Sequence, residues 1–179
     1  MRIKTSNIVI RAFERKDAEN FFRIVREKSI LRFMPDWARK GTRPQDYYEP
    51  IDWSQAHQDV ADISIKRPYA IALPGTDEMI GMAAVGLKET LHEVEVAYFM
   101  SEKYQGLGYT KEAIDALTQW CFEVSDVPYL ILTIDCANDP SNSLAQKCGF
   151  ELFEKRTPIG QKNPNMQSDG YFYCRKYRK

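Results

Sequence analysis

The sequence predicts a single α/β domain built around a mixed sheet, and three observations lead to this fold class. The 179 residues fit one ordinary domain, which at this size buries about 70% of the surface that its unfolded chain would expose. Three successive segments with a β-strand pattern follow Pro68, and such a succession is typical of an antiparallel meander. A later and almost wholly apolar segment, YLILTIDC, is typical of a buried parallel strand.

The N-terminal part predicts a short strand and then an amphipathic helix. Residues 8–10 form a β-branched run, and apolar residues then recur at helical spacing, at Ala18, Phe21, Phe22 and Val25. A second helix is predicted from Ser54 as its N-cap, with Ala56, Val60 and Ile63 on one face and an end where Arg67 meets Pro68.

The segment between these two helices, Ser29 to Trp53, is predicted to be irregular. It is aromatic and longer than the about 12 to 15 residues that are usual for a loop without secondary structure. Because long loops of this kind often cover a site, we expect the segment to lie over one.

The middle of the chain predicts the sheet. The segments YAIAL, MIGMAAVGL and VEVAYFM are the three strands of the meander, and with the first strand they make a four-stranded sheet. A helix follows, closed by Pro128 and carrying an apolar stripe made of Ala113, Leu117, Trp120, Cys121 and Val124. The buried strand YLILTIDC comes next.

The C-terminal part predicts a short helix and a hairpin. Asp139 and Pro140 are typical of an N-cap and a first helical residue, and Gly149 suits the residue after the helix. The segments FELFEKR and GYFYCRKY are predicted to pair around the loop TPIGQKNPNMQSD. No repeat or linker divides the chain, so residues 1–179 are predicted to form one domain.

Composition excludes several classes of partner and site. The chain carries 25 basic and 25 acidic residues, so no overall field favours nucleic acid or an anionic membrane. The cysteines form no CxxC pair and the two histidines have no ligand spacing, so we expect reduced thiols and no metal. Without a secretory signal or a span of about 20 apolar residues, we expect a cytoplasmic protein.

The first candidate site is the segment that precedes the 113–124 helix. It consists of Gln105, Gly106, Leu107, Gly108, Tyr109 and Thr110. Two glycines allow close approach of a ligand to the backbone, and the free N–H groups of a helix's first turn suit a pyrophosphate. A turn that merely starts a helix is an equal alternative. Because the GxxxxGK frame is absent, a nucleoside triphosphatase is poorly supported.

The second candidate site follows the buried strand and runs from Asn138 to Phe150, including Ser141. On its own this segment is better explained as helix capping. However, ligands of open α/β sheets gather beyond the carboxyl ends of strands, and both candidate segments belong to that edge in the predicted fold.

Together these segments resemble the GNAT superfamily of N-acetyltransferases, especially its Rim-type ribosomal-protein N-terminal acetyltransferase branch. The family's acetyl-CoA signature, Q/R-x-x-G-x-G/A, is similar to Gln105 to Thr110, and its later N-x-x-S and K-x-G-F patterns are similar to Asn138–Ser141 and Lys147–Phe150. The resemblance spans nearly the whole chain. Thr110 departs from the usual Gly or Ala, so we expect an adjusted pyrophosphate site.

The resemblance implies a GNAT-like fold and an acetyl-CoA site. The fold is a mixed, mostly antiparallel sheet, splayed near its middle and flanked by about four helices. Phe99 and Met100 pair with the pantetheine arm as an added strand does, the amides from Gly106 to Thr110 hold the pyrophosphate, and Asn138 and Ser141 lie near the thioester.

The catalytic candidates also come from the resemblance. Glu95 is similar to the glutamate of the branch's E-x-G/A-Y pattern and is the candidate base, directly or through water, with a solvent-facing carboxylate as the alternative. Ala145 stands where many members have a proton-donating tyrosine, so Ser141 is the candidate acid, with helix capping as the alternative. Cys136 and Cys148 lack a histidine partner, which favours packing for both thiols and direct attack by the amine.

The predicted function is therefore acetyl transfer from acetyl-CoA to a primary amine. The acceptor is either a protein N-terminal amine or a small amine-bearing molecule, and no nucleic acid, membrane or metal takes part. A non-catalytic acyl-CoA-binding module is the alternative, and a nucleotide-binding protein that uses the Gly106 loop is the least favoured. A homodimer stays open, because the sequence does not give the oligomeric state.

Overall fold

The computed structural model describes residues 1–56, 63–157 and 167–178. Its centre is one eight-stranded sheet with the strand order β1-β2-β3-β4-β5-β6-β8-β7. The strands are β1 (Arg2–Lys4), β2 (Val9–Arg11), β3 (Arg67–Ala72), β4 (Met79–Lys88), β5 (Glu93–Met100), β6 (Tyr129–Asp135), β7 (Glu151–Arg156) and β8 (Tyr171–Tyr177). The predicted meander and C-terminal hairpin are confirmed, whereas β1 was not predicted.

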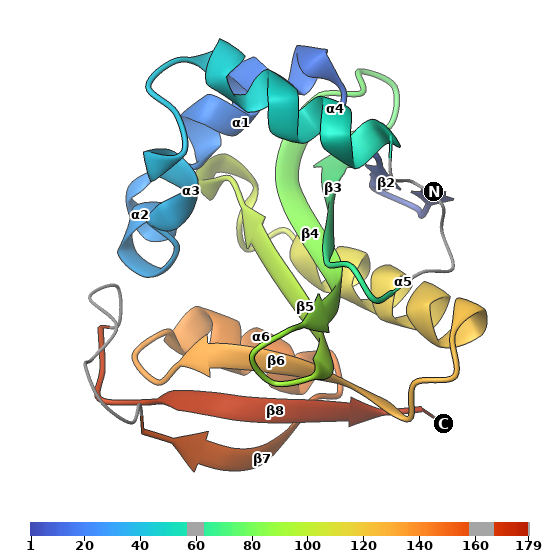
Figure 1. Ribbon diagram of the computed structural model, residues 1–179, viewed down its shortest axis with the longest axis vertical. Coiled ribbons are helices and arrows are strands. Elements are labelled where there is room, and N and C mark those ends of the chain that lie inside the picture. Colours follow the sequence, from blue (N-terminus) through green and yellow to red (C-terminus); the bar gives the residue numbers. More distant parts are fainter. Residues whose placement is uncertain (57–62, 158–166, 179) are drawn as a thin grey trace.

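The sheet opens between β5 and β6, its one parallel pair. All other neighbouring strands pair antiparallel over several residues, but β5 and β6 share a single registered pair, Glu95 with Ile131. Figure 1 shows the two strands diverging toward the left of the view, where α2 (Lys28–Phe33) lies above the gap. The predicted mixed and mostly antiparallel sheet, splayed near its middle, is therefore confirmed.

The helices number six in the described residues, not four. Besides α2 they are α1 (Ala18–Ile24), α3 (Asp36–Arg39), α4 (Tyr48–Ala56), α5 (Tyr109–Val124) and α6 (Asp139–Lys147). Short 3-10 turns occupy Arg15–Asp17, Pro44–Tyr47 and Glu102–Tyr104. None of the helices in the described ranges is long and apolar enough to cross a membrane.

Four predicted boundaries in the helical parts are wrong, and the fourth is the helix end predicted at Arg67 and Pro68. The 29–53 segment contains α2 and α3 and the start of α4, so it is largely helical. Ser54 lies inside α4 as a buried residue and donates from Oγ to the carbonyl of Pro68, so it is not an N-cap. Asn138, one residue earlier than predicted, caps α6. Val60 lies outside the described residues, and Arg67 and Pro68 belong to β3.

The two faces of the sheet bury two separate apolar clusters. On one face, Val96 and Met100 of β5 pack with residues of α5 and β6, including Ile114, Leu117 and Leu130. On the other face, Phe99 packs with residues of α1 and α4, such as Phe21 and Ile51. Because side chains alternate along a strand, β5 contributes to both clusters. Both faces are therefore packed up to the place where β5 and β6 separate.

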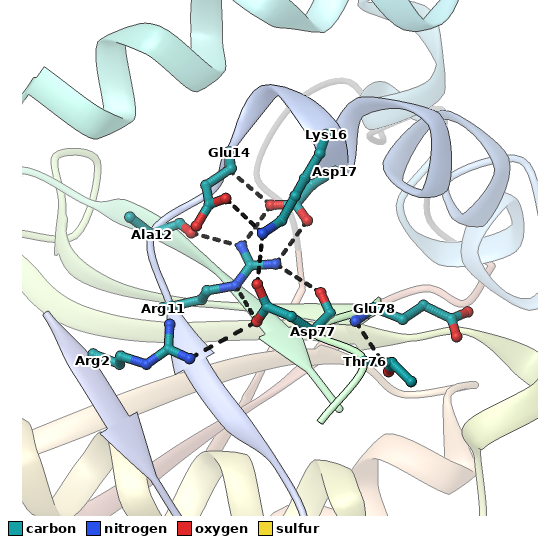
Figure 2. A network of polar contacts seen from close by, with 9 residues as sticks. All are labelled: Arg2, Arg11, Ala12, Glu14, Lys16, Asp17, Thr76, Asp77 and Glu78. Carbon is teal, nitrogen blue, oxygen red and sulfur yellow. Dashed lines mark hydrogen bonds and ion pairs between the residues drawn. The ribbon is translucent and has the colours of Figure 1, made fainter. Parts of the chain in front are cut away.

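Arg11 of β2 ties the helical layer to the sheet, as Figure 2 shows. Its side chain is 3% exposed, and its guanidinium donates to Asp17 at 2.7 and 2.9 Å and also to the side chain and the carbonyl of Asp77. Lys16 binds Asp77 as well. Loss of one partner from such a buried pair costs about 3 to 5 kcal/mol, because the remaining charge stays buried without a partner. The network thus fixes where α1 begins relative to the β3–β4 turn.

Candidate active site

A cleft of about 510 Å³ lies where β5 and β6 diverge. Its walls come from α2, the end of β5, the loop and first turn at the start of α5, and the first two turns of α6. Both segments that the sequence singled out therefore meet in one cleft, as the strand-edge argument predicted.

The end of β5 forms the floor of the cleft through Tyr98, Phe99 and Met100. Beyond Glu95 these residues make no further registered pair with β6, so this edge of the strand can accept an added strand-like ligand. The carbonyl of Met100 already accepts a bond of 2.8 Å from the side-chain amide of Gln105. Gln105 thus fixes the segment before α5 to the end of β5.

The segment before α5 fits a pyrophosphate. Gly106 and Gly108 have φ values of +75° and +85°, which L-residues with side chains rarely adopt, and a Cβ added at either would meet no protein atom within 4 Å. Gly108 is the N-cap of the 16-residue helix α5, so the free amides and positive dipole end of that helix lie at the cleft. Lys111 and Lys147 also line it; Lys111 is paired with Asp115 at 2.5 Å, so Lys147 adds most of the positive charge.

Most of the residues predicted to bind the cofactor line this cleft. They are Phe99, Met100, Gln105, Gly106, Gly108, Thr110, Asn138 and Ser141. Leu107 and Tyr109 of the same signature do not: Leu107 is 59% exposed, and Tyr109 packs against Tyr104 with ring centroids 6.4 Å apart. Thr110 lies in the first turn of α5, so its hydroxyl can reach the same ligand as the glycines.

The start of α6 supplies the wall opposite α2. The side chain of Asn138 accepts a 3.3 Å bond from the backbone N–H of Ser141. The capping interpretation of this segment is therefore confirmed, with Asn138 in place of the predicted Asp139 as the N-cap. Capping does not exclude a binding role, because Asn138 and Ser141 also line the cleft. Helix α6 begins at this edge since Pro140 fits the first helical turn, where no N–H is needed.

The α2 wall is one part of the site that sequence patterns did not identify residue by residue. Ser29, Ile30, Phe33 and Met34 line the cleft, so the first residues of the 29–53 segment, which was predicted to lie over a site, do border the candidate site. Contacts with the other walls hold α2 in place. The carboxylate of Glu102 accepts from the backbone N–H of Ser29 at 2.8 Å, while the side-chain amide of Gln105 donates to the Ser29 hydroxyl at 3.1 Å.

Tyr98 is the second part that sequence patterns missed. Its ring lines the cleft, and its hydroxyl lies 3.5 Å from the carbonyl of Ser141. Burial raises its pKa to about 12, so the hydroxyl keeps its proton at neutral pH. A phenol in a strand that is otherwise apolar on this face, beside Val96 and Met100, was the available signal.

Glu95 lies at the vertex of the strand separation but is not among the cleft-lining residues. Its buried carboxylate accepts bonds from the ammonium groups of Lys66 and Lys88 and from the hydroxyl of Thr133. Burial alone would raise the pKa of Glu95, but the two ammonium groups outweigh burial, so the pKa is lowered. The expected solvent-facing alternative is wrong, since the side chain is only 7% exposed.

The cysteines give no nucleophile at the cleft. Cys148 is buried, and burial raises its pKa to about 11, which keeps the thiol protonated and unreactive. Neither Cys148 nor Cys136 lines the cleft. In the part of the chain that the structure describes, no group of three or more His, Cys, Asp or Glu side chains is arranged to hold a metal.

Comparison with known proteins gives a family and a fold. A family model described as acetyltransferase (GNAT) domain matches residues 7–151. An uncharacterized N-acetyltransferase of Bacillus subtilis (strain 168), YnaD, is 24% identical over 177 residues, which cover 97% of this chain and 96% of the relative.

Two solved structures illustrate the fold. RimL, a ribosomal L7/L12 α-N-protein acetyltransferase solved with coenzyme A, superposes with a TM-score of 0.79 at 16% identity, over 99% of this chain and 98% of the other. A chimera of the spermidine N-acetyltransferase SpeG from Vibrio cholerae and hSSAT superposes with a TM-score of 0.71 at 17% identity, over 96% of both chains. Because these two acceptors differ, the shared fold alone does not determine the acceptor.

Proposed function

We propose that this chain, which belongs to the acetyltransferase (GNAT) domain family, acetylates the α-amine of a peptide by direct attack of that amine. Membership of the family makes it an acetyl-CoA-dependent N-acetyltransferase, and GNAT acetyltransferases transfer acetyl to amines. The alternative of a non-catalytic acyl-CoA-binding module has no support from the comparisons. The acceptor class and the residue roles below are the parts that we propose.

The residues of the cleft fit acetyl-CoA, which supplies an activated thioester carbonyl when it is bound. The amides from Gly106 to Thr110 hold its pyrophosphate at the start of α5, and Lys147 adds positive charge at the cleft. The free edge of β5 at Phe99 and Met100 orients the arm that leads to the thioester. Asn138 and Ser141 bound the same end of the cleft.

One observation carries the choice of a peptide α-amine. Among the described residues that line the cleft, none is a carboxylate or an imidazole, so the walls hold no strong proton acceptor. An α-amino group needs little help, because roughly a tenth to a fifth of it is neutral at pH 7, against about one lysine side chain in a few thousand. The cleft therefore suits an acceptor with a low pKa.

Direct attack by the amine follows from the same set of cleft-lining residues. Among the described residues no thiol lines the cleft, and the thiol of Cys148 is held protonated by burial. A covalent acetyl-enzyme intermediate would need an activated nucleophile beside a base. The amine nitrogen therefore attacks the carbonyl itself, and Glu95 at the vertex of the splay takes its proton through water.

The acceptor class is tested with two peptides of one sequence that contains a single lysine. One has a free N-terminus, and in the other the N-terminus is blocked, so that only the lysine can react. Thiol release with acetyl-CoA should be at least about 100-fold faster at pH 7 for the free peptide, and kcat/KM should rise with pH, reach half its maximum at about pH 8 and level off above about pH 9. Mass spectrometry locates the acetyl group. Equal rates for the two peptides would overturn the proposed acceptor class.

The departing thiolate needs a proton, for which we propose the hydroxyl of Ser141, with Tyr98 supporting it. The hydroxyl of Tyr98 donates to the backbone carbonyl of Ser141 at 3.5 Å and so fixes the position of Ser141, and its own pKa of about 12 keeps it a donor. Solvent returns a proton to the Ser141 hydroxyl after the thiol leaves. Ser141→Ala and Tyr98→Phe should each lower kcat by about tenfold while leaving the acetyl-CoA Kd unchanged. The double variant should lose less than the product of the two, because both residues serve one proton transfer. Wild-type kcat in Ser141→Ala would contradict the role of Ser141.

A further inference from the structure

The wall of the cleft that contains α2 belongs to the most basic stretch of a chain with no net charge. Residues 23–43 contain seven basic side chains and two acidic ones, although the whole chain has 25 of each. A local excess of this size sets the sign of the potential over a face of the molecule, even where the total charge is zero. The stretch covers the end of α1 and all of α2 and α3.

Contacts within the fold engage four of these seven basic side chains, and three exposed cations remain. Arg23, Arg39 and Arg43 form ion pairs with Glu27, Asp36 and Asp46. Arg26 turns inward, where its guanidinium donates to the carbonyls of Phe22, Ala38 and Gly41. Within the described ranges, no ion pair is found for the other three, which are Lys28, Arg32 and Lys40.

Lys28 and Arg32 stand beside the cleft, whereas Lys40 lines a second, smaller hollow between α1, α3 and α4. Lys28 precedes Ser29, and Arg32 lies over the ring of Phe33 at 5.0 Å, and both Ser29 and Phe33 line the cleft. Lys40 lies 4.3 Å from the ring of Trp37, which in turn packs edge-on against cleft-lining Phe99 with centroids 6.5 Å apart. The three cations form what we call the basic rim: Lys28, Arg32 and Lys40.

We propose that the basic rim selects acceptor peptides whose residues next to the reacting α-amine are acidic. The inference rests on the proposed function and adds the chemistry of the acceptor to it. None of the described residues that line the cleft is a carboxylate, and the carboxylate of Glu102 beside α2 already accepts from the backbone N–H of Ser29, so a polyamine or a lysine-rich peptide meets a wall of mostly like charge. Because the rim extends over two helices, it suits an extended acidic segment better than a small anion.

The peptide experiment uses the full chain with saturating acetyl-CoA and three peptides that share one N-terminal residue. Positions two to six are acidic, neutral or basic. The kcat/KM of the acidic peptide should exceed that of the basic one by at least about tenfold. The ratio should shrink in 0.5 M salt, because the screening length falls from about 10 Å at 0.1 M to about 3 Å at 1 M. Free aspartate and spermidine serve as a small anionic amine and a polycationic amine, and both should react poorly.

The rim itself is tested with Arg32→Gln and Lys40→Gln. Each should raise the KM for the acidic peptide by about three- to fivefold, the size expected for an exposed charge, and leave the KM for the neutral peptide unchanged. Their effects should multiply in the double variant. Lys4→Gln is the matched control, because Lys4 is an exposed lysine on β1, the far edge of the sheet. The control should change none of these constants.

Direct binding separates this inference from the proposed function. A labelled acidic peptide should bind in the presence of CoA, and more weakly to the double variant. Binding without thiol release would contradict the proposed function and leave the rim intact. No preference for the acidic peptide, or faster reaction of free aspartate or spermidine, would overturn the inference. So would variants that raise the KM for acetyl-CoA instead, because the rim would then serve the phosphates of the cofactor.

Discussion

The variant Gly108→Val should lose acetyl-CoA binding by more than about 100-fold while remaining folded. Gly108 lines the cleft with φ at +85°, and a Cβ at this position meets no protein atom within 4 Å. The added side chain therefore projects into the space that the pyrophosphate needs, and the amides at the start of α5 can no longer approach it.

Thermal unfolding measures this loss. Acetyl-CoA at about 100 times its Kd should add about 2.7 kcal/mol to the free energy of unfolding of the wild type, which raises the Tm by roughly 5 to 10 °C. In Gly108→Val this increase should vanish, and thiol release with it.

A second glycine provides the matched control. Gly75, in the β3–β4 turn, has a φ of +90° and likewise no protein atom within 4 Å of an added Cβ, but it does not line the cleft. Gly75→Val therefore carries the same backbone strain, about 1 to 2 kcal/mol, without the block. It should lower the Tm of the free protein and keep the full increase with acetyl-CoA. An increase that survives in Gly108→Val would place the cofactor elsewhere.

Sequence periodicity predicted the sheet well because each strand has a local signal. The segments 79–87 and 129–135 are apolar on both sides, and such segments are strands buried on both faces of a sheet, as β4 and β6 are. Helices α2 and α3 were harder to predict from the sequence. Helices α2 and α3 have six and four residues, too few for a helical period to appear, and they are held by contacts distant in the sequence, such as that between Ser29 and Glu102.

Some residues of the candidate site could likewise be predicted from the sequence, and others could not. Glycine favours the tight turn before α5, and asparagine favours the N-cap of α6, so the residue types alone indicate the local backbone conformation. The sequence could therefore place both segments at the strand edge. Whether a strand side chain faces a ligand or a counter-charge depends on the neighbouring strands. The lysines that bind Glu95 come from positions 66 and 88, and nothing in the order of residues around Glu95 indicates them. Tyr98 was missed for the same reason.

The variant Glu95→Gln should lower kcat by about 100-fold at pH 7 and leave the acetyl-CoA Kd unchanged. General-base catalysis contributes about 10² to 10⁴, and we expect the low end because Lys66 and Lys88 lower the pKa of Glu95 and weaken it as a base. The loss should be larger for a lysine acceptor than for a peptide α-amine, since more protonated amine must be converted.

The pH dependence of that loss identifies the step. Because the pKa of Glu95 is lowered, its carboxylate is ionised throughout pH 6 to 10, and the stability that it contributes is lost only as the pH falls through that low pKa. Any change of the rate ratio between pH 6 and 10 therefore reports the amine. The ratio of wild-type to Glu95→Gln kcat should shrink toward pH 10, where the amine arrives neutral.

Glu93→Gln separates proton transfer from charge balance, because Glu93 lies two residues away on the same face of β5. Its carboxylate is also partly buried and is held by Arg175 at 3.1 Å and by the hydroxyl of Tyr129 at 2.8 Å. Both variants remove a charge from a largely buried ion pair, so both should lower the Tm, but only Glu95 lies at the vertex of the splay, where the proposed proton transfer through water would take place. Glu93→Gln should keep near-wild-type kcat. If the two variants lose equal activity, or if Glu95→Gln loses only stability, Glu95 serves to balance Lys66 and Lys88 and is not the base.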